Sequence, residues 1–266
     1  MGADSSTGRL RRWLTWQRVA IDQIEVRRPG REAALFTAHA CFFFVLAIAI
    51  GLIIRDHPWP LLGAAKFTDD FWYIVVFKVG GLLVLPLALF FGMGYRPGDL
   101  APGWQPSARA ALSIAIAFLV GNAINLQHLS RIGNALRGEP RAGLWLALAA
   151  AAIVPLVAAA IPEEIAFRAI LQTRLEKTCN RPVAIGASVL LFTLWHLPTR
   201  YLLAHGVEGQ AGDLGSVLLG TAVPVAIVGL VFSALWDRYR NLPLLIGLHY
   251  GIDLLPSVSS FLMIEF

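Results

Sequence analysis

Long apolar stretches separated by short polar connections run through most of the 266-residue chain. Most of them approach the roughly 20 residues that an α-helix needs to cross the hydrocarbon core of a bilayer. The connections carry Pro, Gly, Asn and Asp, which end helices and form turns. We therefore expect an all-α fold, a polytopic transmembrane helix bundle that forms one domain without internal repeats. The predicted spans are 33–54, 71–93, 110–126, 143–161, 183–197, 214–236 and 243–262.

One stretch leaves the number of crossings open. Residues 143–177 stay largely apolar for about 35 positions, which is too long for one straight crossing. We expect Pro155 and Pro162 to break this stretch. A single crossing gives seven spans, which the excess of cytoplasmic Lys and Arg favours. A second crossing that begins at Pro162 gives eight spans, which the geometry of the polar residues favours, and the two counts place an intramembrane polar cavity at opposite faces.

The composition excludes the soluble alternatives. Hydrophobic residues make up 57% of the chain and charged residues 15%, against about 45–50% and about 25% in typical soluble domains. The same figures exclude disorder, and two cysteines, Cys41 and Cys179, are too few for a disulfide scaffold. The net charge of +5 comes with no basic face interleaved with aromatic residues. We expect the lipid bilayer as a partner and no nucleic acid.

The first 32 residues form a basic juxtamembrane segment. They contain seven arginines: Arg9, Arg11, Arg12, Arg18, Arg27, Arg28 and Arg31. Arginines just before a first span favour a cytoplasmic amino terminus. Apolar residues recur near helical spacing at Leu10, Trp13, Leu14, Ile21 and Ile24. The segment is therefore either an amphipathic helix on the inner leaflet or a flexible basic tail.

Two ionisable residues, one in the apolar stretch 143–177 and one in the span 183–197, are expected to face each other. Asn180, at the centre of a turn, lies 17 residues after Glu163 and 16 residues before His196. In an antiparallel helix hairpin both side chains then lie roughly 24 Å from the turn, at 1.5 Å per residue. This requires the helix with the glutamate to begin near Pro162. An acid–imidazole pair in a nearly dry cavity can activate water, with Glu163 taking the proton and His196 orienting the water.

A second carboxylate follows directly in the sequence. Adjacent helical residues point about 100° apart, so Glu163 and Glu164 cannot both point at one spot. Glu164 and Arg168 are spaced i, i+4, and we expect them to form an ion pair that braces the helix.

A third polar group lies in the last predicted span. His249 and Asp253 are four residues apart and share a helical face. His249 can donate a hydrogen bond to a developing oxyanion, while Asp253 fixes its tautomer or donates when protonated. Gly247 and Gly251 beside them allow another helix or a substrate backbone to approach closely.

These residues form three motifs that together resemble a known family. Residues 163–168 read EExxxR, residues 192–196 read FxxxH, and residues 249–253 read HxxxD. In this order on consecutive membrane helices, they are similar to the CPBP family. This family comprises the intramembrane CAAX-type proteases and the Abi bacteriocin-processing proteins, related to the type II CAAX prenyl endopeptidase. The resemblance covers roughly residues 143–262.

The resemblance implies hydrolysis of a peptide bond inside a membrane. Glu163 and His196 would activate water, while His249 and Asp253 would shape the oxyanion site. Where the prenyl-protein endopeptidases carry Asn, this chain carries Asp253, which must be protonated or mainly hold His249. The resemblance divides the chain into the basic juxtamembrane segment 1–32, accessory transmembrane helices at 33–142 and a catalytic-type helical core at 143–266. It also implies that the protein lies in a bacterial inner membrane. A prenylated tail, a bacteriocin leader and a membrane-protein anchor remain open as substrates.

Other functions compete for the same residues. Glu163, His196 and His249 would supply one carboxylate and two imidazoles to a catalytic zinc ion, although no HExxH is present. We favour a site without a cofactor and keep zinc as the alternative. Buried carboxylates and histidines also build proton relays in transporters. A membrane immunity or scaffold protein could use the motifs for binding alone.

Several other polar residues are expected to have no catalytic role. His39 in the first span is expected to hydrogen-bond to a neighbouring helix. Lys78 either pairs within the bundle or snorkels, and we assign it no role. Gly80–Gly81 marks close helix packing. We expect three further histidines to lie in solvated loops: His57, His128 and His205.

Overall fold

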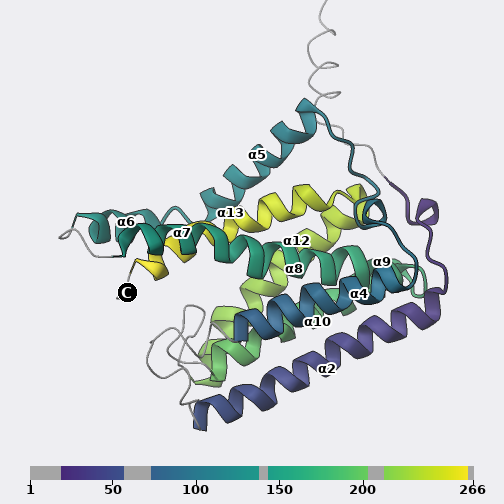
Figure 1. The fold of residues 1–266 in the computed structure, drawn as a ribbon, viewed down its shortest axis with the longest axis horizontal. Coiled ribbons are helices and arrows are strands. Elements are labelled where there is room, and N and C mark those ends of the chain that lie inside the picture. The colour runs from purple at the N-terminus through teal and green to yellow at the C-terminus, as the bar shows by residue number, and fades with distance from the viewer. Residues whose placement is uncertain (1–18, 57–72, 138–142, 203–212, 263–266) are drawn as a thin grey trace, which may run out of the picture.

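A computed structural model describes residues 19–56, 73–137, 143–202 and 213–262, and these ranges are helical with short connections and no strand (Figure 1). The predicted all-α class is confirmed. The expected basic segment falls mostly on residues 1–18, which lie outside the described residues, as do His57 and His205. Of the first 32 residues, the structure describes a short 3₁₀ turn, η1 (Ile21–Gln23), and the start of the first long helix.

The described helices up to Leu136 are taken in two successive sets along the chain. The first consists of α2 (Pro29–Asp56), the π-helical η2 (Tyr73–Val84), α4 (Leu85–Gly92) and the 3₁₀ turn η3 (Pro97–Leu100). The second consists of α5 (Ala108–Ile124) and α6 (His128–Leu136), which meet at an angle of 85°. His128 is the first residue of α6 and is partly buried. The prediction of a solvated loop at His128 is therefore wrong.

The rest of the described chain is almost continuously helical. It contains α7 (Leu144–Pro155), η4 (Leu156–Ala160), α8 (Ile161–Glu163), η5 (Glu164–Gln172) and α9 (Thr173–Glu176). It continues with α10 (Arg181–Leu202), α11 (Leu214–Val217), η6 (Leu218–Ala222), α12 (Val223–Tyr239) and α13 (Leu242–Phe261). The stretches η4, η5 and η6 are π-helical.

Five described helices are long and apolar enough to cross a membrane, or six if the bent α5–α6 pair counts as one span. The five are Pro29–Ile53, Leu144–Glu176, Arg181–Leu202, Leu214–Tyr239 and Leu242–Phe261, and Lys78–Gly92 is shorter. Their outward surfaces remain apolar, for example at Leu146 and Leu219, as contact with lipid requires. Several apolar helices of this kind are typical of a multi-pass membrane protein. The count of seven or eight spans stays a prediction, since the 71–93 stretch begins outside the described residues.

The predicted break at Pro155 and Pro162 is wrong. Residues Leu144–Glu176 form one helical run of 33 residues, so the helix with the glutamates does not begin near Pro162. Proline cannot donate to the carbonyl four residues earlier, and its ring crowds that carbonyl. Here π-helical turns follow Pro155 in η4 and Pro162 in η5, and their wider i→i+5 bonding lets the helix continue past both prolines.

The predicted antiparallel hairpin is present. Helix α9 ends at Glu176 and α10 begins at Arg181, with Asn180 in the turn. The Val183 backbone N–H donates to Asn180 Oδ1 over 3.0 Å, which caps α10. Helix α10 then packs against η5, so the two motif-bearing helices run side by side.

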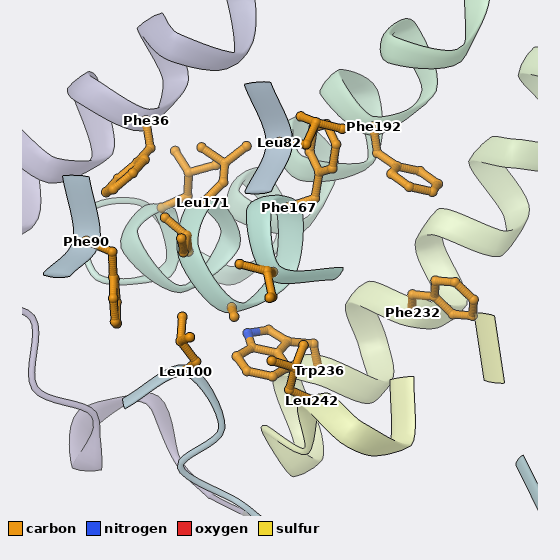
Figure 2. Packing of buried hydrophobic residues seen from close by; sticks show 14 of the residues in the cluster. Phe36, Leu82, Phe90, Leu100, Phe167, Leu171, Phe192, Phe232, Trp236 and Leu242 are labelled. Atoms are coloured by element: carbon orange, nitrogen blue, oxygen red, sulfur yellow. The ribbon is translucent and has the colours of Figure 1, made fainter. Parts of the chain in front are cut away.

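The helix that carries the glutamates lies at the centre of the bundle (Figure 2). Its Phe167 and Leu171 are surrounded by side chains from α2, η2, α4, α10 and α12. From α12, the Trp236 indole N–H donates to Thr173 Oγ1 over 3.0 Å. The buried part of this helix, around the glutamates and Phe167, is removed from lipid, so its polar side chains must find partners within the protein.

Glycines bring α13 close to α5, as the sequence predicts for Gly247 and Gly251. A Cβ atom on Gly251 would lie 2.2 Å from the Phe118 carbonyl oxygen, and one on Gly247 2.7 Å from the Ile114 side chain. Gly121 of α5 packs equally closely against α13, since a Cβ atom on Gly121 would lie 2.4 Å from the Leu248 carbonyl oxygen. Close packing here fixes the helix that carries His249 against the rest of the bundle.

Candidate active site

Three other helices reach the carboxylate of Glu163. This side chain is 1% exposed and lies at the junction of α8 and η5. Its Oε2 atom lies 3.4 Å from His196 Nε2 on α10 and 3.8 Å from His249 Nε2 on α13. Its Oε1 atom lies 3.2 Å from Lys78 Nζ on η2. The hairpin thus brings Glu163 and His196 to the same depth, as their equal distances from the turn predict.

His196 presents one ring nitrogen to the carboxylate. Its Nδ1 atom lies 2.8 Å from the Phe192 carbonyl oxygen, one helical turn earlier. A carbonyl oxygen only accepts, so Nδ1 carries the proton and donates it. In the neutral imidazole, Nε2 then holds a lone pair toward Glu163 Oε2. Two acceptors 3.4 Å apart can both receive a hydrogen bond from one water molecule.

The Glu163 oxygens retain capacity for such a water. Neither oxygen accepts a hydrogen bond of ordinary geometry from the residues that the structure describes, although Lys78 and His196 lie at ion-pair distance. A buried carboxylate normally receives several hydrogen bonds. The geometry therefore leaves Glu163 able to accept from a water or from a substrate group.

The neighbouring Glu164 holds a different partner. Its Oε1 atom lies 2.8 Å from His249 Nδ1 and 3.5 Å from Arg168 Nη1. The expected i, i+4 pair with Arg168 is present, and the contact with His249 is one that the sequence did not predict. Glu163 and Glu164 thus both reach the His249 ring, at different nitrogens, although adjacent helical residues are expected to point at different places.

Asp253 contacts the His249 nitrogen that faces Glu163. Its Oδ2 atom lies 3.3 Å from His249 Nε2, and its side chain is 31% exposed. Both ring nitrogens of His249 therefore face carboxylates, Glu164 at Nδ1 and Asp253 at Nε2. This clamp fixes the ring orientation, and it is geometrically consistent with the holding role expected for Asp253.

Arg168 joins the central helix to two others. Its guanidinium lies 4.0 Å from the centre of the Phe192 ring on α10, and Nη2 donates to the Gly229 carbonyl oxygen on α12 over 3.4 Å. The side chain is fully buried. These contacts join the central helix to α10 and α12 at the level of the carboxylates.

The structure places Lys78 beside Glu163, a position that the sequence did not predict. The only signal in the sequence was an ammonium group within an otherwise apolar stretch, which did not reveal its partner.

His39 lies where the sequence predicts: its Nε2 is 2.7 Å from the Gly81 carbonyl oxygen on the neighbouring η2. A Cβ atom on Gly81 would lie 2.5 Å from the Phe43 ring, so the close packing expected there is confirmed.

The zinc alternative does not fit this arrangement. Among the described residues, no group of three or more His, Cys, Asp or Glu side chains is placed to hold a metal ion. An ammonium group lies 3.2 Å from Glu163, where it would repel a cation. Nδ1 of His249 bonds to Glu164, and its Nε2 faces Asp253 as well as Glu163.

A small cavity lies beside the central helix, and the carboxylates do not line it. It is lined mainly by apolar side chains: Phe36, His39, Ala40, Leu82, Pro86, Ala166, Phe167 and Leu171. Glu163 and His196 are not part of its wall. The polar cavity expected around these two residues therefore stays a prediction.

Comparison with protein families agrees with the motifs. Residues 144–255 match the family described as Rce1-like, Type II CAAX prenyl endopeptidase Rce1-like. The matched segment contains Glu163, Glu164, Arg168, His196, His249 and Asp253. The resemblance to CAAX-type proteases is thereby confirmed, while the match lends no support to bacteriocin processing. No curated protein and no solved structure matches the chain.

Proposed function

We propose, from the premise that residues 144–255 form an Rce1-like domain of the type II CAAX prenyl endopeptidase family, that this protein is an intramembrane endopeptidase. In this proposal, water activated by Glu163 and His196 hydrolyses a peptide bond. One observation carries it: a buried carboxylate with unused acceptor capacity lies 3.4 Å from an imidazole nitrogen inside the matched domain.

The proposed reaction begins with a water molecule that donates to both Glu163 Oε2 and His196 Nε2. The water oxygen attacks the carbonyl carbon of the peptide bond, and its proton passes to Glu163. The C–N bond of the tetrahedral intermediate then breaks, and Glu163 returns the proton to the leaving nitrogen. A nearly dry site strengthens these interactions, because little solvent screens them.

His249 is suited to the developing oxyanion. As an imidazolium it donates from Nδ1 to Glu164, and its Nε2–H lies between Glu163 and Asp253. In this fixed orientation, Nε2–H can donate to the carbonyl oxygen of a peptide bound beside Glu163. We assign Asp253 the role of orienting His249, since a carboxylate placed directly on the oxyanion would repel it.

The substrate class follows from the family rather than from the site. The family name points to a prenylated carboxyl-terminal peptide, which is the substrate to test first. Asp253, in place of the Asn of the prenyl-protein endopeptidases, is the feature that could change this preference. The proposal places the protein in a bacterial inner membrane, with the peptide reaching Glu163 from the bilayer or its surface.

The test is cleavage of reporter peptides by the full chain in liposomes. The set includes a prenylated carboxyl-terminal peptide, its unprenylated form and a transmembrane segment. Glu163→Gln and His196→Ala are expected to lower kcat/KM by about 10²–10⁴-fold, the usual contribution of general acid–base groups. Glu25→Gln, at an exposed position, is the matched control. Retention of the wild-type rate by both site variants would contradict the proposal and favour a scaffold role.

A further inference from the structure

Lys78 occupies a position that membrane proteins rarely give to a lysine. It lies on η2 in the sequence Tyr73–Val84, where every other residue is apolar, tyrosine or glycine. Its side chain is only 3% exposed, and Nζ lies 3.2 Å from Glu163 Oε1. The residue lies outside the matched segment 144–255, so none of the three family motifs includes it.

The packing of η2 keeps Lys78 inside the bundle. Close contact between Gly81 and the Phe43 ring holds η2 against α2. Lysines near helix ends can snorkel to the membrane surface, but Lys78 is buried in the protein interior instead. A buried ammonium is costly unless a negative group compensates it, and Glu163 is that group.

The charges around Glu163 show why this cation matters. On its own helix, Glu164 contributes a carboxylate and Arg168 a guanidinium, and the two already pair over 3.5 Å. His196 approaches from α10, and α13 contributes His249 together with the carboxylate of Asp253. Of the two permanent cations in this group, Lys78 is the one at ion-pair distance from Glu163.

We propose that Lys78 is a positioning residue that keeps Glu163 ionised and directs its Oε2 atom toward His196. This inference rests on the proposed function and refines it. The ammonium lies beside Oε1, and the other oxygen is the one that faces both histidines. An ionised Glu163 is the form that can accept a proton from water.

The first experiment is a pH profile of kcat/KM for Lys78→Met. An opposite charge within about 4–6 Å shifts the titration of a carboxylate by about 1–3 pH units. Loss of the ammonium should therefore move the acid limb of the profile upward by about 1–3 pH units, with activity recovering at higher pH. Lys78→Arg should return the limb toward its wild-type position. Lys177→Met, which removes the same charge at a partly exposed position, should leave it unchanged.

A structural role would give a different result. An equal loss of activity at every pH, or an unchanged acid limb in folded Lys78→Met, would overturn the inference. Helical circular dichroism in detergent checks folding. If Lys78→Met does not fold, Lys78→Gln carries the same test, because it removes the charge and keeps a hydrogen-bond donor.

An infrared titration separates this inference from the proposed function. Difference spectra between each protein and its Glu163→Gln counterpart report whether Glu163 is protonated, without any cleavage. The protonated carboxyl band should appear at higher pH in Lys78→Met than in the wild type. If the carboxyl band shifts in Lys78→Met but the wild-type protein cleaves no peptide, the protease proposal is refuted and the role of Lys78 is not. Cleavage with no shift would refute the role of Lys78 alone.

Discussion

A buried ion pair ties the first long helix to the helix that carries the glutamates. Glu32 Oε2 on α2 lies 3.3 Å from Arg174 Nε on α9, and the two side chains are 3% and 2% exposed. The Tyr95 hydroxyl also donates to Glu32, over 2.8 Å to Oε2. We expect Arg174→Met to destabilise the bundle strongly, because it leaves Glu32 buried without its cation.

The magnitude follows from the separation and the burial. Coulomb's law at an effective dielectric constant of about 20 gives roughly 5 kcal/mol at this distance. Removing one partner of a buried pair typically costs about 3–5 kcal/mol. Arg174→Met also loses the hydrogen bond to the Ala169 carbonyl oxygen and the contact with the Phe90 ring, 4.9 Å away. We therefore expect the free energy of unfolding to fall by about 3–5 kcal/mol.

The assay is reversible unfolding in mixed micelles, with SDS as the denaturant and tryptophan fluorescence as the signal. A double-mutant cycle adds Glu32→Gln and the combined variant, since the amide oxygen of Gln can still accept from Tyr95. The expected coupling energy is about 2–3 kcal/mol. Arg181→Met is the control, because Arg181 is 61% exposed in its pair with Asp237 and should cost at most about 1 kcal/mol. Equal losses for Arg174→Met and Arg181→Met would refute the reasoning.

Three further outcomes follow from the site and its packing. Gly251→Leu should cost about 1–3 kcal/mol or prevent folding, since its Cβ would meet the Phe118 carbonyl oxygen at 2.2 Å, and the same unfolding titration measures this. Asp253→Asn should cleave faster than Asp253→Ala, because an amide oxygen can still accept from His249; a kcat comparison in which both lose equally would speak against the holding role. Chelator treatment should leave cleavage unchanged, because Lys78 supplies the cation beside Glu163, and activity lost to chelator and restored by zinc would contradict this.

Local spacing predicted the parts of the site that depend on a single hairpin. The turn at Asn180 fixes the relative depth of Glu163 and His196, and i, i+4 geometry fixes the pair of Glu164 with Arg168. Both relations require only the rise and rotation of a regular helix. The all-α class followed equally directly from the length of the apolar stretches.

Contacts between distant helices could not be predicted in this way. Neither the pairing of Lys78 with Glu163 nor that of Glu164 with His249 follows from any local periodicity, since they depend on how whole helices pack. The predicted break at Pro162 failed for a different reason. Proline removes a hydrogen bond, but it does not specify whether the helix ends or continues through a π-helical turn.

The most direct test of the central claim is a single turnover in water enriched in ¹⁸O, with enzyme in excess over peptide. Attack by a water held between Glu163 and His196 predicts that the label enters the new carboxyl terminus of the product and that the Glu163 carboxylate stays unlabelled. Mass spectrometry of the product and of the proteolysed enzyme measures both positions. Label in Glu163 would reveal a covalent intermediate on that carboxylate, and a product without label would show that water is not the nucleophile. Either result would contradict the account.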